Sequence, residues 1–315
     1  MIERHFFNPE TTVNSEMIRR LMHAALTNIR AGKLNDGNRL RIIEILDDID
    51  NHRIGFTKFP VPEALRHFIL SWSYLFDNSA RYETERIVPR IGATLIINLN
   101  PERYLTNTPL DAYSGVVVLP NEGYRNLQQS TSIKRIFVHF TPAGLHLLTR
   151  IPQEQLANKI TDAAYVFGPA FDELHERLMY APGPEYYLQH LTDFFTMRAN
   201  KVVDSVPAHV VDYMVNNIET PLSQTIQRTG YSKKHVVNLL KQYIGTTPKQ
   251  LQLINRLNRI ITQFNPAQHS HFPFTETDFY DEAHFSRAFR HHIGMTPLQY
   301  KKGGFFCSKR LLVSE

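Results

Sequence analysis

The chain has 315 residues, and its 42% hydrophobic and 11% aromatic content exclude a largely disordered protein. The net charge of +5 is unevenly distributed: residues 1–201 hold 22 basic and 22 acidic side chains, and residues 202–315 hold the remaining 13 basic and 8 acidic ones. A basic part joined to a neutral part is typical of a polyanion-binding module attached to a second domain.

A single cysteine, Cys307, excludes an internal disulfide framework and a cysteine-based zinc cluster. No stretch approaches the roughly 18 uninterrupted apolar residues that cross a bilayer. The N-terminus lacks the apolar core of a signal peptide. We therefore expect a cytoplasmic protein without a membrane partner.

Residues 14–51 are predicted to form two helices, because apolar side chains recur there at helical spacing. These side chains are Met17, Leu21, Ala24, Ala25 and Ile29, then Leu40, Ile43, Leu46 and Ile49. The stripes leave two alternatives open, which are packing within the chain and self-association as a homodimer.

Short apolar runs rich in β-branched and aromatic residues follow Pro62, with prolines and glycines between them. The predicted strands are 68–74, 94–99, 115–119 and 133–140. This spacing favours a β-barrel or sandwich over alternating βαβ units. From Pro142 to about Arg198 the pattern becomes helical, with Phe171, Leu174 and Leu178 on one stripe.

The basic third contains an internal repeat with an offset of 49 residues, in which Ile244-Gly245-x-Thr247-Pro248 matches Ile293-Gly294-x-Thr296-Pro297. Each copy predicts a helix of about a dozen residues that ends at a left-handed glycine, followed by a new helix capped by threonine. Between the copies, residues 248–264 are predicted to form one long helix.

Both repeated helices have an apolar stripe and a polar face. Val236, Leu239, Leu240 and Tyr243 are predicted to point inward in the first helix, and Phe285, Ala288, Phe289 and Ile293 in the second. The opposite faces carry groups that bond base edges or phosphates in DNA complexes. The candidate DNA-binding residues are Ser232, Lys233, Lys234, His235, Val237, Asn238, Lys241, Glu282, Ala283, His284, Ser286, Arg287 and Arg290.

Residues 207–302 resemble the tandem helix-turn-helix domain of AraC-family transcription regulators. The resemblance is carried by Gly230-Tyr231-Ser232, by the two Ile-Gly-x-Thr-Pro motifs and by the stretch from Asp281 to Arg290. Residues 59–178 are similar to a sensory domain of some of these regulators, through Glu85–Pro89 and Phe137-x-x-x-x-Pro142-x-Gly144. The resemblance implies a cupin-like β-barrel and two helices that enter successive major-groove segments.

The sequence departs from the family pattern in both supporting helices. Ile226 and Phe274 stand where the family usually has a small residue, Asp278 replaces the turn glycine of the second unit, and Pro273 interrupts its helix. An alternative function follows from these departures, namely an effector-binding or protein-interaction module whose second unit has lost DNA binding.

Metal-binding and catalytic sites are not expected. His269, His271, His291, His292, His139 and His146 have no carboxylate or cysteine at a recognised ligand spacing, so we interpret them as surface or capping residues. No nucleophile elbow, phosphate-binding loop or paired carboxylate occurs, so an enzyme would need a polar constellation inside the barrel that the sequence does not reveal. No cofactor is expected.

The predicted protein is thus an α+β multidomain chain. It consists of a helical extension (1–55), a cupin-like β-barrel with C-terminal helices (56–200), an all-α tandem helix-turn-helix domain (204–302) and a tail (303–315). The expected partners are double-stranded DNA, RNA polymerase, a small-molecule effector and a second copy of the chain. Activation or repression would depend on the position of the operator, which lies outside this sequence.

Overall fold

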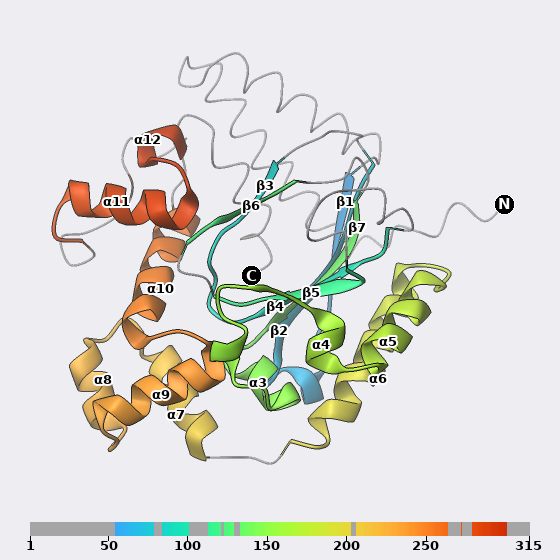
Figure 1. Cartoon of the computed structure of the whole chain (residues 1–315), viewed down its shortest axis with the longest axis horizontal. Coiled ribbons are helices and arrows are strands. Elements are labelled where there is room, and N and C mark those ends of the chain that lie inside the picture. Colours follow the sequence, from blue (N-terminus) through green and yellow to red (C-terminus); the bar gives the residue numbers. More distant parts are fainter. Residues whose placement is uncertain are drawn as a thin grey trace.

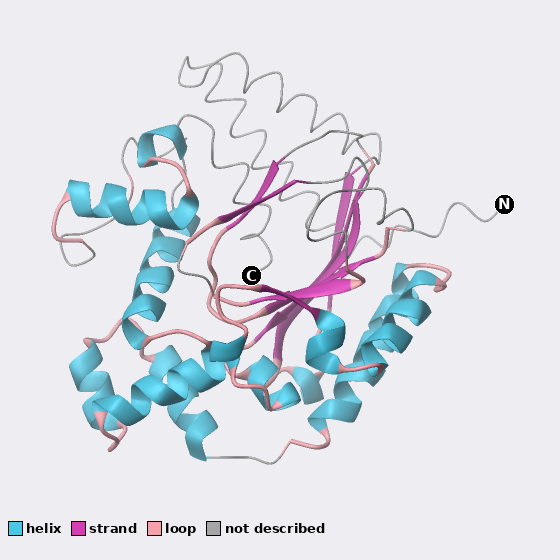
Figure 2. Cartoon of the chain, in the orientation of Figure 1, coloured by secondary structure: helices cyan, strands magenta, loops and turns pink. Residues whose placement is uncertain are grey.

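The computed structural model describes residues 54–78, 84–100, 113–120, 123–128, 133–202, 206–263, 272 and 279–300. An antiparallel β-domain comes first and a set of helices follows it, which confirms the predicted fold class (Figure 2). The predicted helices of residues 14–51 and the tail 303–315 lie outside the described residues. None of the described helices is long and apolar enough to span a membrane.

The β-domain contains one six-stranded antiparallel sheet and one two-stranded ribbon (Figure 1). The order in the sheet is β1 (Ile54–Phe59), β2 (Ile69–Asp77), β7 (Ile133–Phe140), β4 (Thr94–Asn98), β5 (Gly115–Val118) and β8 (Ile160–Asp162). The ribbon pairs β3 (Thr84–Ile87) with β6 (Arg125–Gln128). All four predicted strands are confirmed, whereas β1, β3, β6 and β8 were not predicted.

Strand β8 corrects the expectation that residues 142–198 are only helical. It has three half-buried residues and pairs with β5 across more than 40 positions of sequence. Such a short edge strand has no room for an alternating pattern, so its pairing depends on the partner strand rather than on its own composition.

The sheet is buried on both faces, which explains the nearly continuous apolar runs of its central strands. Along β7 only Lys134 is exposed. Ile136, Val138 and Phe140 join the main hydrophobic core, while Phe137, on the opposite face, packs with Ile96, Val116 and Val118. Successive residues of a strand point to opposite faces, so both faces must be covered for this pattern to be stable.

One face of the sheet is covered by helices α3 (Gly144–Thr149), α4 (Ala163–Phe167), α5 (Ala170–Met179) and α6 (Pro184–Ala199), together with the single turns η2 (Glu63–Leu65) and η4 (Gln153–Gln155). Phe195 of α6 packs edge-on against Phe140 at 5.8 Å between ring centroids. The fully buried Trp72 donates its indole N–H to the Pro60 carbonyl at 2.9 Å, so its polar atom is satisfied inside the core.

The C-terminal part is all helical among its described residues. It contains α7 (Val206–Asn216), α8 (Leu222–Arg228), α9 (Lys233–Ile244), α10 (Pro248–Gln263), α11 (Glu282–Ile293) and α12 (Pro297–Gln299). The two repeated helices are α9 and α11, each of 12 residues as predicted, and α10 connects them (Figure 1). Residues of α9 belong to the same hydrophobic cluster as the core of the β-domain, so the two parts share packed surface.

Candidate nucleic-acid interface

The first unit has the geometry of a helix-turn-helix. Helix α8 ends at Arg228, Gly230 adopts a left-handed conformation with a φ of 73°, and α9 begins three residues later. Ser232 is the N-cap of α9, and its Oγ accepts the backbone N–H of His235 at 3.2 Å. The cap satisfies one of the free N–H groups of the first turn and fixes where the helix starts.

Helix α9 is oriented by its apolar stripe. Val236, Leu239, Leu240 and Tyr243 are all buried, which confirms the predicted inward face. Lys233, Lys234, His235 and Asn238 are exposed, and Val237 and Lys241 are half-buried. The exposed side chains therefore lie along the N-terminal half of the helix, which is the half that reads base edges in helix-turn-helix proteins.

The second unit repeats this arrangement with different chemistry. Asp281 is the N-cap of α11, and its Oδ1 accepts the backbone N–H of His284 at 2.6 Å. Glu282, Ala283, His284, Arg287 and Arg290 are exposed, and Ser286 is half-buried. The first turn of α11 carries an acidic residue, whereas that of α9 carries none. The first unit thus offers the more favourable N-terminus for a phosphate.

Both helices end as the repeat predicts. Gly245 and Gly294 are left-handed C-caps with φ values of 84° and 82°. Thr296 forms a capping box with Gln299 at the start of α12, and Thr247 Oγ1 accepts the N–H of Gln250 at 3.3 Å at the start of α10. These local patterns form because caps and turns depend on neighbouring residues only.

Side chains of helix α10 contact both helix-turn-helix units. Gln252 donates to the carbonyls of Ile218 and Thr220, at 2.9 and 3.0 Å, and so ties α10 to the turn before α8. The guanidinium of Arg256 lies 5.4 Å from the ring centroid of Phe279, in front of α11. A cation over an aromatic ring at this distance is an attractive contact.

Three of the histidines that were interpreted as surface or capping residues are not at the surface. His139, His146 and His292 are buried rather than at the surface. His292 lies 3.2 Å from Asn258 Oδ1, and burial, with a contribution from the charge of His291, lowers the pKa of His292 to about 3. Sequence spacing could not reveal this, although His292 does follow the apolar stripe at position i+3 from Phe289.

Two aromatic residues in front of the recognition helices were not among the predicted site residues. Tyr231 and Tyr280 occupy equivalent repeat positions, and they are 39% and 92% exposed. The Tyr231 ring stacks on His235 with centroids 4.6 Å apart. Their equivalence in the repeat is the pattern that could have identified them.

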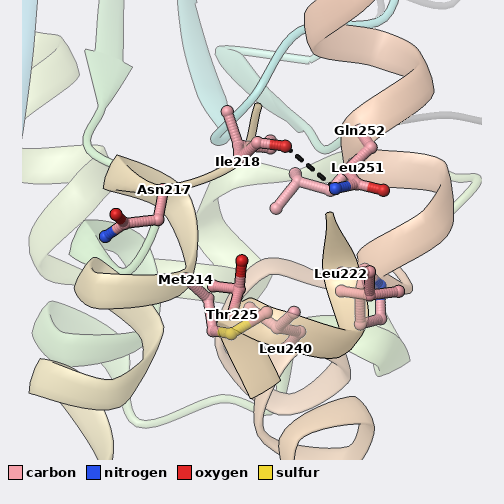
Figure 3. A pocket seen from close by; sticks show the side chains of 9 residues that line it. Met214, Asn217, Ile218, Leu222, Thr225, Leu240, Leu251 and Gln252 are labelled. Atoms are coloured by element: carbon pink, nitrogen blue, oxygen red, sulfur yellow. Dashed lines mark hydrogen bonds between the residues drawn. The ribbon is translucent and has the colours of Figure 1, made fainter. Parts of the chain in front are cut away.

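A small cavity lies inside the first unit, between α7, α8, α9 and α10 (Figure 3). Its volume is about 10 Å³, roughly the space of one water molecule. Met214, Leu222, Leu240 and Leu251 line it together with the polar Thr225, Asn217 and Gln252. Ile226, which departs from the family pattern, is buried and directly follows Thr225 in α8. Its counterpart Phe274 and the other two departures, Pro273 and Asp278, lie outside the described residues.

The second face of the β-sheet is partly polar. Cross-strand register places Ser71, His139 and Thr94 in one row, and Leu75, Arg135 and Asn98 in another. Thr94 Oγ1 and His139 Nδ1 are 2.9 Å apart, and burial lowers the pKa of His139, as do the charges of Arg90 and Lys58. The buried Ser73 Oγ has no hydrogen-bond partner among the described residues. This interior is therefore not purely apolar.

Metal-ligating groups do not converge in the described part of the chain, where no three histidine, cysteine, aspartate or glutamate side chains are placed to hold an ion. His269, His271 and Cys307 lie outside the described residues.

The C-terminal helical units are similar to known proteins. Residues 226–303 match the model of a family described as a helix-turn-helix domain. Among solved structures, ToxT from Vibrio cholerae O395 is similar at 10% identity and a TM-score of 0.34, over 74% of this chain and 97% of that chain. A second structure of Vibrio cholerae ToxT matches at 11% identity and a TM-score of 0.34, over 74% and 98%. No curated protein sequence matches significantly.

Proposed function

Because residues 226–303 match a helix-turn-helix domain of the AraC type, we propose that the chain is a sequence-specific DNA-binding transcription regulator. Helices α9 and α11 would enter successive major-groove segments. The main support for this proposal is that α9 and α11 are both 12-residue helices with a side-chain N-cap, and that polar side chains are exposed in the N-terminal half of each.

The first helix would supply most of the base reading. Asn238 is an exposed amide that can pair bidentately with adenine, and Lys233 and Lys234 can reach phosphates or guanine. Val237 offers an apolar contact to a thymine methyl group, and Lys241 would bind the backbone. Ser232 and His235 lie at the helix start, where phosphates bind.

The second helix would act mainly through its arginines. Arg287 and Arg290 are exposed on α11 and can bind guanine or phosphate, and His284 and Ser286 can add hydrogen bonds. Glu282 and Ala283 at the helix start would face the groove edge, where Glu282 can accept a hydrogen bond from cytosine.

The β-domain would bind a small-molecule effector or mediate dimerisation. The polar rows on the second sheet face support the effector, because a few convergent polar groups in an apolar surrounding are typical of ligand sites. The regulator would act on RNA polymerase in the cytoplasm. The proposed boundaries of the β-domain and the helix-turn-helix domain are residues 56–200 and 204–302.

The experiment is capture of genomic DNA fragments by the full-length protein, followed by affinity measurements at several salt concentrations. Neutralising about 6 phosphates gives a log-log salt slope near −5 for duplex DNA. The proposal fails if no fragment is enriched and the protein's own promoter region is not shifted at low salt.

A further inference from the structure

The C-caps of both recognition helices lie against the β-domain. A Cβ atom on Gly245, after α9, would lie 2.9 Å from Leu119 Cδ2 and 3.0 Å from the Gln153 carbonyl oxygen. A Cβ on Gly294, after α11, would lie 2.5 Å from the Tyr124 ring. Leu119 directly follows β5 and Tyr124 directly precedes β6. One connection of the β-domain therefore meets the equivalent ends of both repeated helices.

The first unit is also joined to the β-domain by packing. The ring of Tyr243 on α9 lies against His146 on α3, with centroids 4.2 Å apart. Tyr243 and Ile244 belong to the hydrophobic cluster that contains Leu145 and Leu148 of α3. Close-packed interiors resist displacement, so α9 is held as part of the β-domain core.

The second unit is joined to the β-domain by a chain of hydrogen bonds. Asn258 of α10 donates its Nδ2 to the Pro89 carbonyl, which precedes β4, at 3.2 Å. Its Oδ1 lies 3.2 Å from His292 Nε2 of α11. A proline carbonyl can only accept, so the amide nitrogen must face Pro89 and its oxygen must accept from His292 Nε2–H. Pro89 thus determines the orientation of Asn258 and the tautomer of His292.

We propose that the β-domain sets the distance and angle between the two recognition helices, and that Asn258 is the positioning residue that connects it to α11. This inference rests on the proposed DNA-binding function. Two helices on one face of DNA must match the spacing of successive major-groove segments. A side chain that bonds the β-domain and α11 at once couples their positions without touching DNA.

Three variants of the full-length chain test this role. Asn258→Leu removes both hydrogen bonds. Asn258→Asp keeps an acceptor for His292 but has no donor for Pro89, so it breaks only the bond to the β-domain. Asn255→Asp is the control, because it adds the same carboxylate to α10 one turn earlier, where Asn255 is likewise half-buried. Circular dichroism checks that each variant folds.

The measurement is affinity for the best captured DNA fragment and for versions with one or two base pairs inserted between the two contacted segments. We expect insertion to weaken wild-type and Asn255→Asp binding at least tenfold. Both Asn258 variants should bind the original spacing about three- to tenfold more weakly, and insertion should then cost them less than threefold. A merely structural role would lower affinity equally at every spacing.

Two results would overturn the proposal while leaving DNA binding intact. If affinity depends on the inserted base pairs in the same way for the wild type and the three variants, Asn258 does not set the position of α11. If insertion costs less affinity in Asn258→Leu alone, the effect is due to the hydrogen bond with His292, and the bond to the β-domain does not contribute to the spacing of the helices. Absence of any wild-type DNA binding would instead reject the proposed function, and this inference with it.

Discussion

The rings of His146 and Tyr243 lie 4.2 Å apart between centroids, at an interplanar angle of 51°, and join the β-domain to the first recognition helix. Both side chains are buried, and burial lowers the pKa of His146. The His146 Nδ1 lies 2.8 Å from the Ile151 carbonyl, which fixes the ring in place. Folding of the two parts is therefore expected to be coupled through this contact.

Tyr243→Ala should destabilise the whole chain. Removing a buried aromatic ring costs about 3–5 kcal/mol, and here the cavity opens at the junction of the two parts. Urea unfolding followed by circular dichroism measures the loss. Tyr180→Ala is the matched control, because Tyr180 is 84% exposed and its removal should change stability by less than about 0.5 kcal/mol. Equal effects of the two changes would contradict the packing role.

His292→Gln should make the protein less sensitive to acid. The pKa of His292 is about 3 in the fold and about 6.5 when unfolded, so protons bind the unfolded chain first as the pH falls. The stability contribution is present above pH 6.5 and is lost towards pH 3. Between pH 7 and pH 5 the wild type should lose about 2 kcal/mol more than His292→Gln.

The histidine prediction is checked by denaturation at both pH values, with His291→Gln as the control. His291 is exposed, so its replacement should leave the pH dependence close to that of the wild type. The prediction is wrong if the two glutamine variants have the same acid sensitivity.

Gly245→Ala should cost more than Gly230→Ala, although both glycines are left-handed. Backbone strain at a positive φ costs about 1–2 kcal/mol in each variant. At Gly245 the added methyl group would also meet Leu119 and Gln153, whereas no atom of the described residues lies within 4 Å of a Cβ at Gly230. Thermal unfolding of the two variants gives the difference, and equal costs would exclude close contact between the α9 C-cap and the β-domain.

Asn238→Ala should relax base preference at one position of the DNA site and cost about 1–3 kcal/mol of binding energy. Because asparagine is neutral, the salt slope should stay unchanged. Lys234→Ala, measured in parallel, should reduce the slope by about 1 if the lysine neutralises a phosphate. Lys159→Ala removes the same charge from the β-domain and should have neither effect; an identical loss there would indicate nonspecific attraction only.

Replacing both Arg287 and Arg290 with alanine tests whether the second unit binds DNA. If α11 enters the groove, affinity should fall at least tenfold and the salt slope by about 2, because two exposed cations are lost. Electrophoretic mobility shift with the captured fragment measures both. Unchanged affinity would favour the alternative module, in which the second unit makes no DNA contact.

The local features of this protein could be predicted from its sequence. The two 12-residue helices, their glycine C-caps and their buried stripes follow from spacing and capping residues within a few positions of each other. The same holds for the central strands β2, β4, β5 and β7, because runs of β-branched residues between turns are local too. Sequence alone did not reveal β1, β3, β6 and β8.

The contacts between these elements are visible in the folded chain alone. Asn258 and Pro89 are separated by 169 positions, and nothing in the spacing of either indicates the hydrogen bond between them. His292 and His146 were interpreted as surface or capping residues, and they are buried because segments distant in sequence cover them. Hydrophobic burial is not directional, so a local pattern shows that a face must be covered but not which segment covers it.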